Sequence, residues 1–367
     1  MSKVKIGIVG CGNISGIYFE NLTGVFRNTE VYACADLIEE RAREAAEKYK
    51  VPHVMSTEEL LADKEIQIVV NLTTPDGHYE VCKAALMAGK HVYVEKPLSL
   101  SLEHGTELVS LAKEKGLMIG CAPDTFLGSG LQLCRKLIDD GFIGAPVAAT
   151  AFMVCHGHEG WHPDPEFYYK KGGGPMFDMG PYYLTALVSL LGPAAVVSGM
   201  TKTSFAQRTI GSEQKFGQKI DVEVPTHVAG TVKFAGGAIA SVITSFDVWS
   251  SQLPRIEIYG SLGTLIVPDP NTFGGPVLLR PAQGGEFMEV PLVLAYAENS
   301  RGIGVADMAR CIKTGDTPRA SGELALHVLE IMHAFHTSSD NGQYEFLHTS
   351  CDRPSPFSPG LVRGELA

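Results

Sequence analysis

Residues 4–15 read VKIGIVGCGNIS, a short apolar run that stops at a glycine-rich turn. Such a run is typical of a strand buried on both faces of a parallel sheet. In the turn, Gly10 permits a sharp reversal of the chain, and Gly12 lets an anion approach the backbone. A helix pattern begins at Ile14, and the free N–H groups at its start favour a pyrophosphate. The stretch therefore predicts a dinucleotide site.

The alternation of strand and helix patterns continues to residue 121, which predicts parallel crossovers and a doubly wound sheet. The predicted strands are 4–9, 31–35, 66–71, 91–94 and 118–121, and the predicted helices are 14–22, 39–49, 78–88 and 102–115.

Asp36 directly follows the second predicted strand. A carboxylate at this position can accept hydrogen bonds from both ribose hydroxyls of the adenosine half, and it would repel a 2′-phosphate. We therefore expect NAD rather than NADP as the cofactor. The alternative is that Asp36 only caps the helix that follows.

The pattern changes after residue 123 and becomes rich in strands, which predicts a second domain over 124–347 after a first domain over 1–123. The remaining residues, 348–367, are rich in Pro, Ser and Gly and are expected to be loosely ordered. The predicted strands are 147–154, 195–201, 226–234, 238–246, 255–259, 264–267 and 277–279, and the predicted helices are 130–139, 304–313 and 322–335.

The composition excludes several classes of partner. The chain of 367 residues carries a net charge of −11 and no basic stripe, which argues against nucleic acid and anionic membrane surfaces. Apolar runs stay shorter than the roughly 18 residues of a membrane span. The 8 cysteines form no CxxC pair and read as buried, reduced side chains. We expect a cytoplasmic protein.

Three later blocks carry a resemblance to a known family: NLTTPDGH at 71–78, EKP at 95–97 and GGGPMFDMGPYYL at 172–184. With the glycine turn, they resemble the glucose–fructose oxidoreductase / inositol dehydrogenase (Gfo/Idh/MocA) family. The resemblance implies a Rossmann domain and an α+β domain with a large open, mainly antiparallel sheet that joins homodimers or homotetramers. It also implies NAD-dependent hydride transfer to or from a secondary alcohol of a sugar, polyol or glycoside.

Lys96 follows the fourth predicted strand, at the sheet edge where α/β proteins bind ligands. Its ammonium, with Glu95 as a partner, can hold a substrate oxygen and stabilise developing negative charge. The family resemblance also makes it the catalytic lysine. The alternative is a surface Glu–Lys pair in a turn.

Asp178 and Tyr182 lie four residues apart, so on a helix they share one face. Much of the family has histidine where this chain has Tyr182. We expect Tyr182 to exchange a proton with the reacting hydroxyl, Asp178 to orient it, and Lys96 to lower the phenol pKa from about 10. The alternative is that Tyr182 and Tyr183 are core aromatics.

Further site residues follow from the same motifs. Substrate contacts are expected from Lys96, Asp178 and Tyr182 and from Trp161 and His162 in a glycine-rich loop. No metal is expected, although His156, His158 and His162 have the types and spacing of zinc ligands. The expected cofactor contacts are Gly10, Gly12, Asn13, Ile14, Asp36, Thr73, Thr74, Pro75, His78, Glu95 and Lys96.

Two other functions share most of these motifs. One is an NAD-dependent glycosidase of the same family, which oxidises a sugar carbon transiently and eliminates the aglycone. The other is a non-catalytic regulator that binds NAD. The combination of Lys96, Asp178 and Tyr182 argues against the regulator, because a sensor does not need proton-transfer groups.

Overall fold

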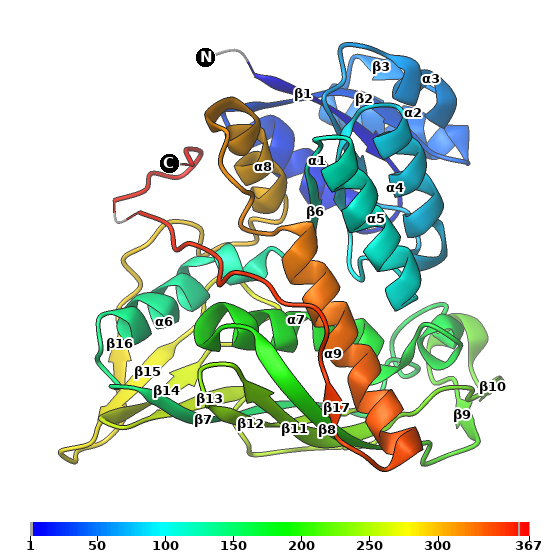
Figure 1. Cartoon of the computed structure of the whole chain (residues 1–367). Helices are drawn as coiled ribbons and strands as arrows, with labels where there is room; N and C mark the ends of the chain where they lie inside the picture. Colours follow the sequence, from blue (N-terminus) through cyan, green and yellow to red (C-terminus); the bar gives the residue numbers. More distant parts are fainter. Residues whose placement is uncertain (1–2, 359, 367) are drawn as a thin grey trace.

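The first domain of the computed structural model, which describes residues 3–358 and 360–366, is a six-stranded parallel sheet in the order β3-β2-β1-β4-β5-β6. Helices lie on both faces of the sheet (Figure 1). The elements are β1 Val4–Val9, α1 Ser15–Gly24, β2 Thr29–Ala35, α2 Glu39–Tyr49, β3 His53–Val54, α3 Thr57–Ala62, β4 Ile68–Asn71, α4 His78–Met87, β5 His91–Val94, α5 Leu102–Glu114 and β6 Ile119–Cys121.

The strand patterns explain this domain. The four residues of β4 are all buried, and so are Ile6 to Val9 of β1, because helices cover both faces of a parallel sheet. The predicted doubly wound fold is confirmed. The short elements β3 and α3 were not predicted, since two and six residues are too few to show a period.

The second domain contains a nine-stranded sheet in the order β16-β15-β14-β13-β7-β12-β11-β8-β17, in which β7 and β12 run parallel and the other described neighbours run antiparallel. The predicted large, mainly antiparallel sheet is confirmed. The strands are β7 Pro146–Val154, β8 Ala194–Lys202, β11 His227–Phe234, β12 Ile239–Ser245, β13 Ile256–Gly260, β14 Gly263–Val267, β15 Val277–Pro281, β16 Met288–Val290 and β17 Glu345–Phe346. A separate hairpin pairs β9 Gln207–Thr209 with β10 Lys219–Asp221.

Helices cover one face of this sheet, and within residues 3–358 and 360–366 no helix lies on the other face (Figure 1). The covering helices are α6 Ser129–Asp139, α7 Gly174–Leu191 and α9 Gly322–Asn341. Buried side chains alternate along β7 and β12, which places the core between sheet and helices.

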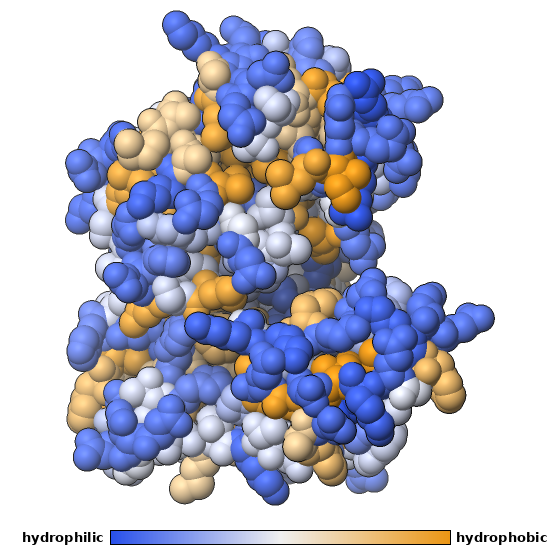
Figure 2. Space-filling model, turned by 90° about the vertical axis from the view of Figure 1, so that its right-hand side faces the viewer, coloured by the Kyte–Doolittle hydropathy of each residue, from blue (hydrophilic) through white to orange (hydrophobic). Residues whose placement is uncertain are grey.

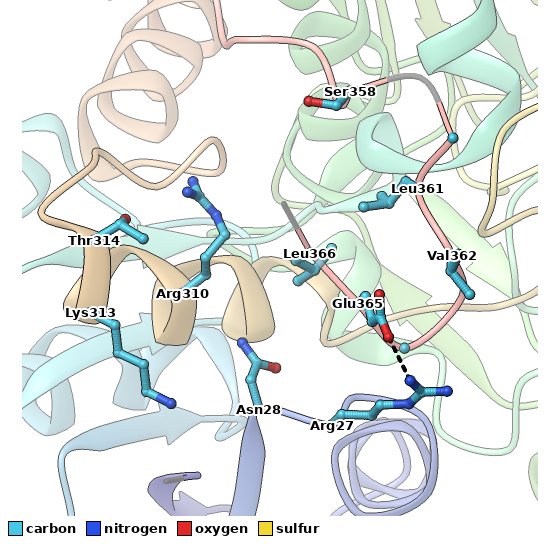
Figure 3. A pocket seen from close by; sticks show the side chains of 12 residues that line it. Arg27, Asn28, Arg310, Lys313, Thr314, Ser358, Leu361, Val362, Glu365 and Leu366 are labelled. Carbon is cyan, nitrogen blue, oxygen red and sulfur yellow. Dashed lines mark hydrogen bonds and ion pairs between the residues drawn. The ribbon is translucent and has the colours of Figure 1, made fainter. Parts of the chain in front are cut away.

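The last part of the chain returns to the first domain. Helix α8, Ile303–Thr314, packs beside β6, and Asn28 donates a hydrogen bond to the carbonyl of Ala306 at 2.8 Å. In the tail, residues 348–358 and 360–366 contain no helix or strand, but they contact both domains. Arg135 donates to the Pro354 carbonyl at 2.6 Å, and Glu365 pairs with Arg27. A cavity of about 680 Å³ lies between α8 and the tail (Figure 3).

The surface shows two lobes in the space-filling view, with a narrowing between them (Figure 2). Of the helices that the structure describes, none combines the length and apolar character that crossing a bilayer requires.

Candidate active site

The glycine turn has the geometry of a ligand site. Gly10 has φ +99°, and a side chain there would press against the Leu72 carbonyl group at the end of β4. A Cβ on Gly12, by contrast, would meet no protein atom within 4 Å. The space over Gly12 is therefore open at the start of α1, where free N–H groups suit a pyrophosphate.

Asp36 directly follows the last residue of β2. One carboxylate oxygen accepts a hydrogen bond from the Cys11 N–H at 2.7 Å, and the other accepts from the Ile38 N–H at 2.8 Å. The carboxylate thus ties the glycine turn to the residue that precedes α2. An ionised carboxylate has about four acceptor sites, so these bonds leave room for ribose hydroxyls.

A cleft of about 310 Å³ is lined by residues from two parts of the sequence, within 14–97 and within 167–182. The carboxyl ends of β4 and β5 form one wall, and helix α7 forms another. Of the residues named from sequence, those that line it are Ile14, Thr73, Pro75, His78, Glu95, Lys96, Asp178 and Tyr182. The described lining does not include Asn13, Thr74, Trp161 or His162.

Lys96 and Asp178 form a partly buried ion pair in this cleft. The Lys96 ammonium donates to the Asp178 carboxylate at 3.0 Å and to its carbonyl at 2.7 Å. Burial alone would lower the pKa of Lys96, but the charges around it, Asp178 first, raise it overall. Burial alone would raise the pKa of Asp178, yet the Lys96 ammonium and a hydrogen bond from His158 hold it at about 2. Both groups are therefore charged near neutral pH.

Glu95 has a different partner from the one expected. Its carboxylate accepts hydrogen bonds from the Tyr18 hydroxyl at 2.8 Å and from the Lys96 backbone N–H at 2.9 Å, while the Lys96 ammonium bonds to Asp178. The charge of Glu95 still raises the pKa of Lys96, but the hydrogen bonds described for the ammonium go to Asp178. Glu95 instead fixes the backbone at the end of β5.

Tyr182 lies beneath the lysine, with the Lys96 ammonium 5.4 Å from its ring centre. Burial raises the pKa of its phenol, and this effect outweighs the opposing charges of Lys96 and Arg301. The expectation of a net lowered pKa is therefore wrong, because the cleft desolvates the phenolate. The neighbouring Tyr183 points elsewhere, with its hydroxyl 3.4 Å from a nitrogen of Arg255.

His78 connects the loops after β4 and β5. One ring nitrogen lies 2.7 Å from the Pro97 carbonyl and the other 3.1 Å from the Thr73 carbonyl. The Thr73 hydroxyl donates in turn to Asn71 at 2.7 Å. These contacts fix the two loops that would border a bound cofactor.

The loop between β7 and α7 brings a residue that sequence reasoning did not select. His158 Nε2 lies 3.1 Å from the Asp178 carboxylate. Trp161, by contrast, is 63% exposed, and His162 accepts a hydrogen bond from the Asp164 N–H. The sequence signalled three candidate histidines, but no pattern indicated which one turns inward.

The three histidines do not converge on a metal. His156 stacks on Trp249 with ring centres 3.4 Å apart, and His158 faces Asp178. Over residues 3–358 and 360–366, no cluster of three or more His, Cys, Asp or Glu side chains has a metal-binding arrangement.

Two family models match the chain. Residues 4–122 match the model described as an oxidoreductase family with an NAD-binding Rossmann fold, and residues 131–266 match the GFO/IDH/MocA C-terminal domain.

Curated relatives and solved structures agree with these matches. A 1,5-anhydro-D-fructose reductase from Ensifer adhaerens is 30% identical over 328 residues, covering 86% of this chain and 90% of the relative. A myo-inositol 2-dehydrogenase from Thermotoga maritima is 25% identical over 329 residues, covering 87% and 91%. A levoglucosan dehydrogenase in complex with NADH and L-sorbose has the same fold, with a TM-score of 0.80, 20% identity and coverage of 95% and 100%.

Proposed function

The chain belongs to the Gfo/Idh/MocA family of NAD-binding Rossmann-fold oxidoreductases, and we propose that it transfers a hydride between NAD and a secondary alcohol of a sugar, polyol or glycoside. Relatives named as a myo-inositol 2-dehydrogenase and a D-xylose dehydrogenase support this substrate class.

The observation that carries the proposal is the partly buried ion pair of Lys96 and Asp178 in the cleft between the two domains. The ammonium lies at the carboxyl edge of the parallel sheet, where Rossmann proteins bind their ligands. Its partner comes from the other domain, so a substrate bound in the cleft would contact both. A positive group held in this way stabilises negative charge on a substrate oxygen.

The residues around the glycine turn fit NAD. Gly10, Gly12 and the start of α1 would hold the pyrophosphate, and Asp36 would hold the adenosine ribose. Thr73, Pro75 and His78 line the same cleft as Lys96 and would border the nicotinamide half. NAD, when bound, supplies the hydride acceptor or donor. The side chains of the protein orient the substrate, stabilise negative charge on its oxygen and exchange a proton with it.

The polar groups divide the remaining work. The Lys96 ammonium binds the reacting oxygen of the substrate, and the Asp178 carboxylate fixes the position of the ammonium. Tyr182 enters the cleft with its proton, because burial raises its pKa. It donates that proton to the oxygen when a carbonyl is reduced, and in its ionised form it takes the proton back when an alcohol is oxidised.

The direct test is an absorbance screen for NADH formation against sugars, polyols and glycosides, with NAD and NADP in parallel. The proposal predicts net NADH formation with at least one polyhydroxylated substrate and a preference for NAD. Aglycone release without net NADH would indicate the glycosidase instead. NAD binding without turnover across the panel would indicate a regulator.

We also propose that the enzyme self-associates through the open face of its nine-stranded sheet. Met200 and Ile239 are 79% and 50% exposed on that face, next to residues that face the helices. Exposed sheet surfaces of this kind favour symmetric oligomers. A cytoplasmic location is proposed as well, because all eight cysteines are unpaired thiols.

A further inference from the structure

We propose that His158 and Arg208 are positioning residues of the Lys96–Asp178 pair, with Arg208 fixing the loop that carries His158 and His158 fixing the carboxylate of Asp178. This inference rests on the proposed function of that pair. It assigns a task to the hairpin of β9 and β10, which stands apart from both large sheets.

The loop that carries His158 has little structure of its own. Between β7 and α7, residues 155–173 contain one short 3₁₀ helix, Glu166–Tyr169. A side chain on an irregular loop holds a precise position only if other contacts fix the loop. The contacts that fix this loop must therefore come from elsewhere in the domain.

Arg208 of β9 supplies them from a buried position. Its guanidinium bonds to the Glu159 carboxylate at 2.6 and 2.7 Å and to the Asp247 carboxylate at 2.9 Å. It also donates to the carbonyls of His156 at 3.0 Å and Phe246 at 3.1 Å. Arg208 and Glu159 are only 5% and 6% exposed. The two residues that flank Gly157-His158 are thus bonded to one guanidinium.

Other contacts close the same cluster. The Tyr169 hydroxyl donates to the second oxygen of Glu159, and Thr226 donates to Asp247 at 2.7 Å. The hairpin turn adds backbone bonds, since the Gly211 N–H donates to the Glu159 carbonyl at 2.8 Å. Each carboxylate in the cluster is therefore hydrogen-bonded, which a buried charge requires.

His158 lies between this cluster and the catalytic pair. Its ring packs against Tyr168 at 4.3 Å and Phe246 at 4.8 Å between ring centres. Its Nε2 reaches the oxygen of Asp178 that Lys96 leaves free, since Lys96 bonds to the other one. The carboxylate is thus held from both sides. Without His158, the Asp178 carboxylate can turn, and the ammonium turns with it.

Side-chain replacements separate positioning from folding. A displacement of about 1 Å in a catalytic group can cost on the order of 100-fold in rate. We expect His158→Ala to lower kcat by about that factor, with the KM for NAD unchanged. His158→Gln should recover at least about 10-fold of the loss, because its amide N–H can replace Nε2.

Arg208→Lys tests the contacts that fix the loop of His158. A lysine keeps the charge but lacks the fork of five donors, so it cannot hold both carboxylates and both carbonyls. We expect kcat to fall about 10-fold in a folded enzyme. His348→Gln and Arg43→Lys, both at exposed sites, serve as controls and should match the wild type.

A second readout does not depend on turnover. Acylation of Lys96 by an amine reagent, followed by mass spectrometry, should be several-fold faster in His158→Ala and Arg208→Lys, because a loosened Asp178 protects the amine less. Unchanged kcat and unchanged labelling in His158→Ala would overturn the inference. If the wild type oxidises no sugar, the proposed function fails, and the labelling still decides the positioning role.

Discussion

At the scale of single residues, the protonation state of Tyr182 leads to a pH prediction. Burial raises its pKa above the ordinary value of 10.0, so the phenol is protonated near neutral pH. Alcohol oxidation needs the ionised form as acceptor, whereas carbonyl reduction needs the protonated form as donor. We therefore expect kcat for oxidation to keep rising through the alkaline range, and kcat for reduction to fall there. Tyr182→Phe should remove both trends, as measured by pH profiles in each direction.

The sequence identified most of the residues that meet in the cleft, for physical reasons. Lys96 was found because a parallel strand delivers the next residues to the ligand edge of a sheet. The resemblance of residues 172–184 to the family motif pointed to Asp178 and Tyr182, and their four-residue spacing predicted that they share one helix face. His158 was not selected, because its place depends on Arg208, fifty positions later in an unpredicted hairpin. The hydrogen bond from Tyr18 to Glu95 was not predicted, because Tyr18 lies on α1, far from Glu95 in the sequence.

At the scale of an element, the start of helix α8 is hydrogen-bonded to a buried carboxyl group, Asp124, whose ionisation should affect stability. Asp124 accepts hydrogen bonds from the N–H groups of Gly302 and Gly304 at 2.9 and 3.0 Å. Burial raises the pKa of this carboxyl to about 6 despite these bonds and the nearby Arg301. The folded state therefore binds a proton that the unfolded state releases near pH 3.8.

A stability measurement tests this contact. Because the folded pKa is raised, the free energy of unfolding should fall as pH rises from about 4 to 6, by on the order of 3 kcal/mol. Asp124→Asn cannot ionise and should lack this decline, while the exposed Asp340→Asn should keep it. Parallel declines in all three proteins under urea titration would contradict the assignment.

Element patterns predicted the fold well where elements are long. The strand patterns of β1, β2, β4, β5 and β6 and the helix patterns of α1, α2, α4 and α5 were enough to predict the Rossmann domain. The elements β3, β9 and β10, of two or three residues each, show no period and were missed. The bounds of helix α7, Gly174–Leu191, were not predicted, because its start lies among glycines and Pro175.

At the scale of the whole molecule, the open sheet face predicts an oligomer. Wild-type protein should sediment as a dimer or larger species at micromolar concentration. Replacing Met200 and Ile239 together by glutamate should shift it towards monomer. The carboxylates of the two subunits would repel each other, and they would lose their hydration in an apolar interface. A matched pair of exposed changes away from the sheet, Met87→Glu with Leu37→Glu, should leave the species unchanged. A monomeric wild type would contradict this part.

Lys96 acts on the substrate in the proposed mechanism, while NAD is expected to bind through other residues of the cleft and the glycine turn. The most direct measurement compares Lys96→Met with wild type for both NAD binding and turnover in the same preparation. We predict that Lys96→Met binds NAD with near-normal affinity, by fluorescence titration, and loses turnover by on the order of 1,000-fold or more. Near-normal turnover in Lys96→Met would contradict a catalytic role for this lysine.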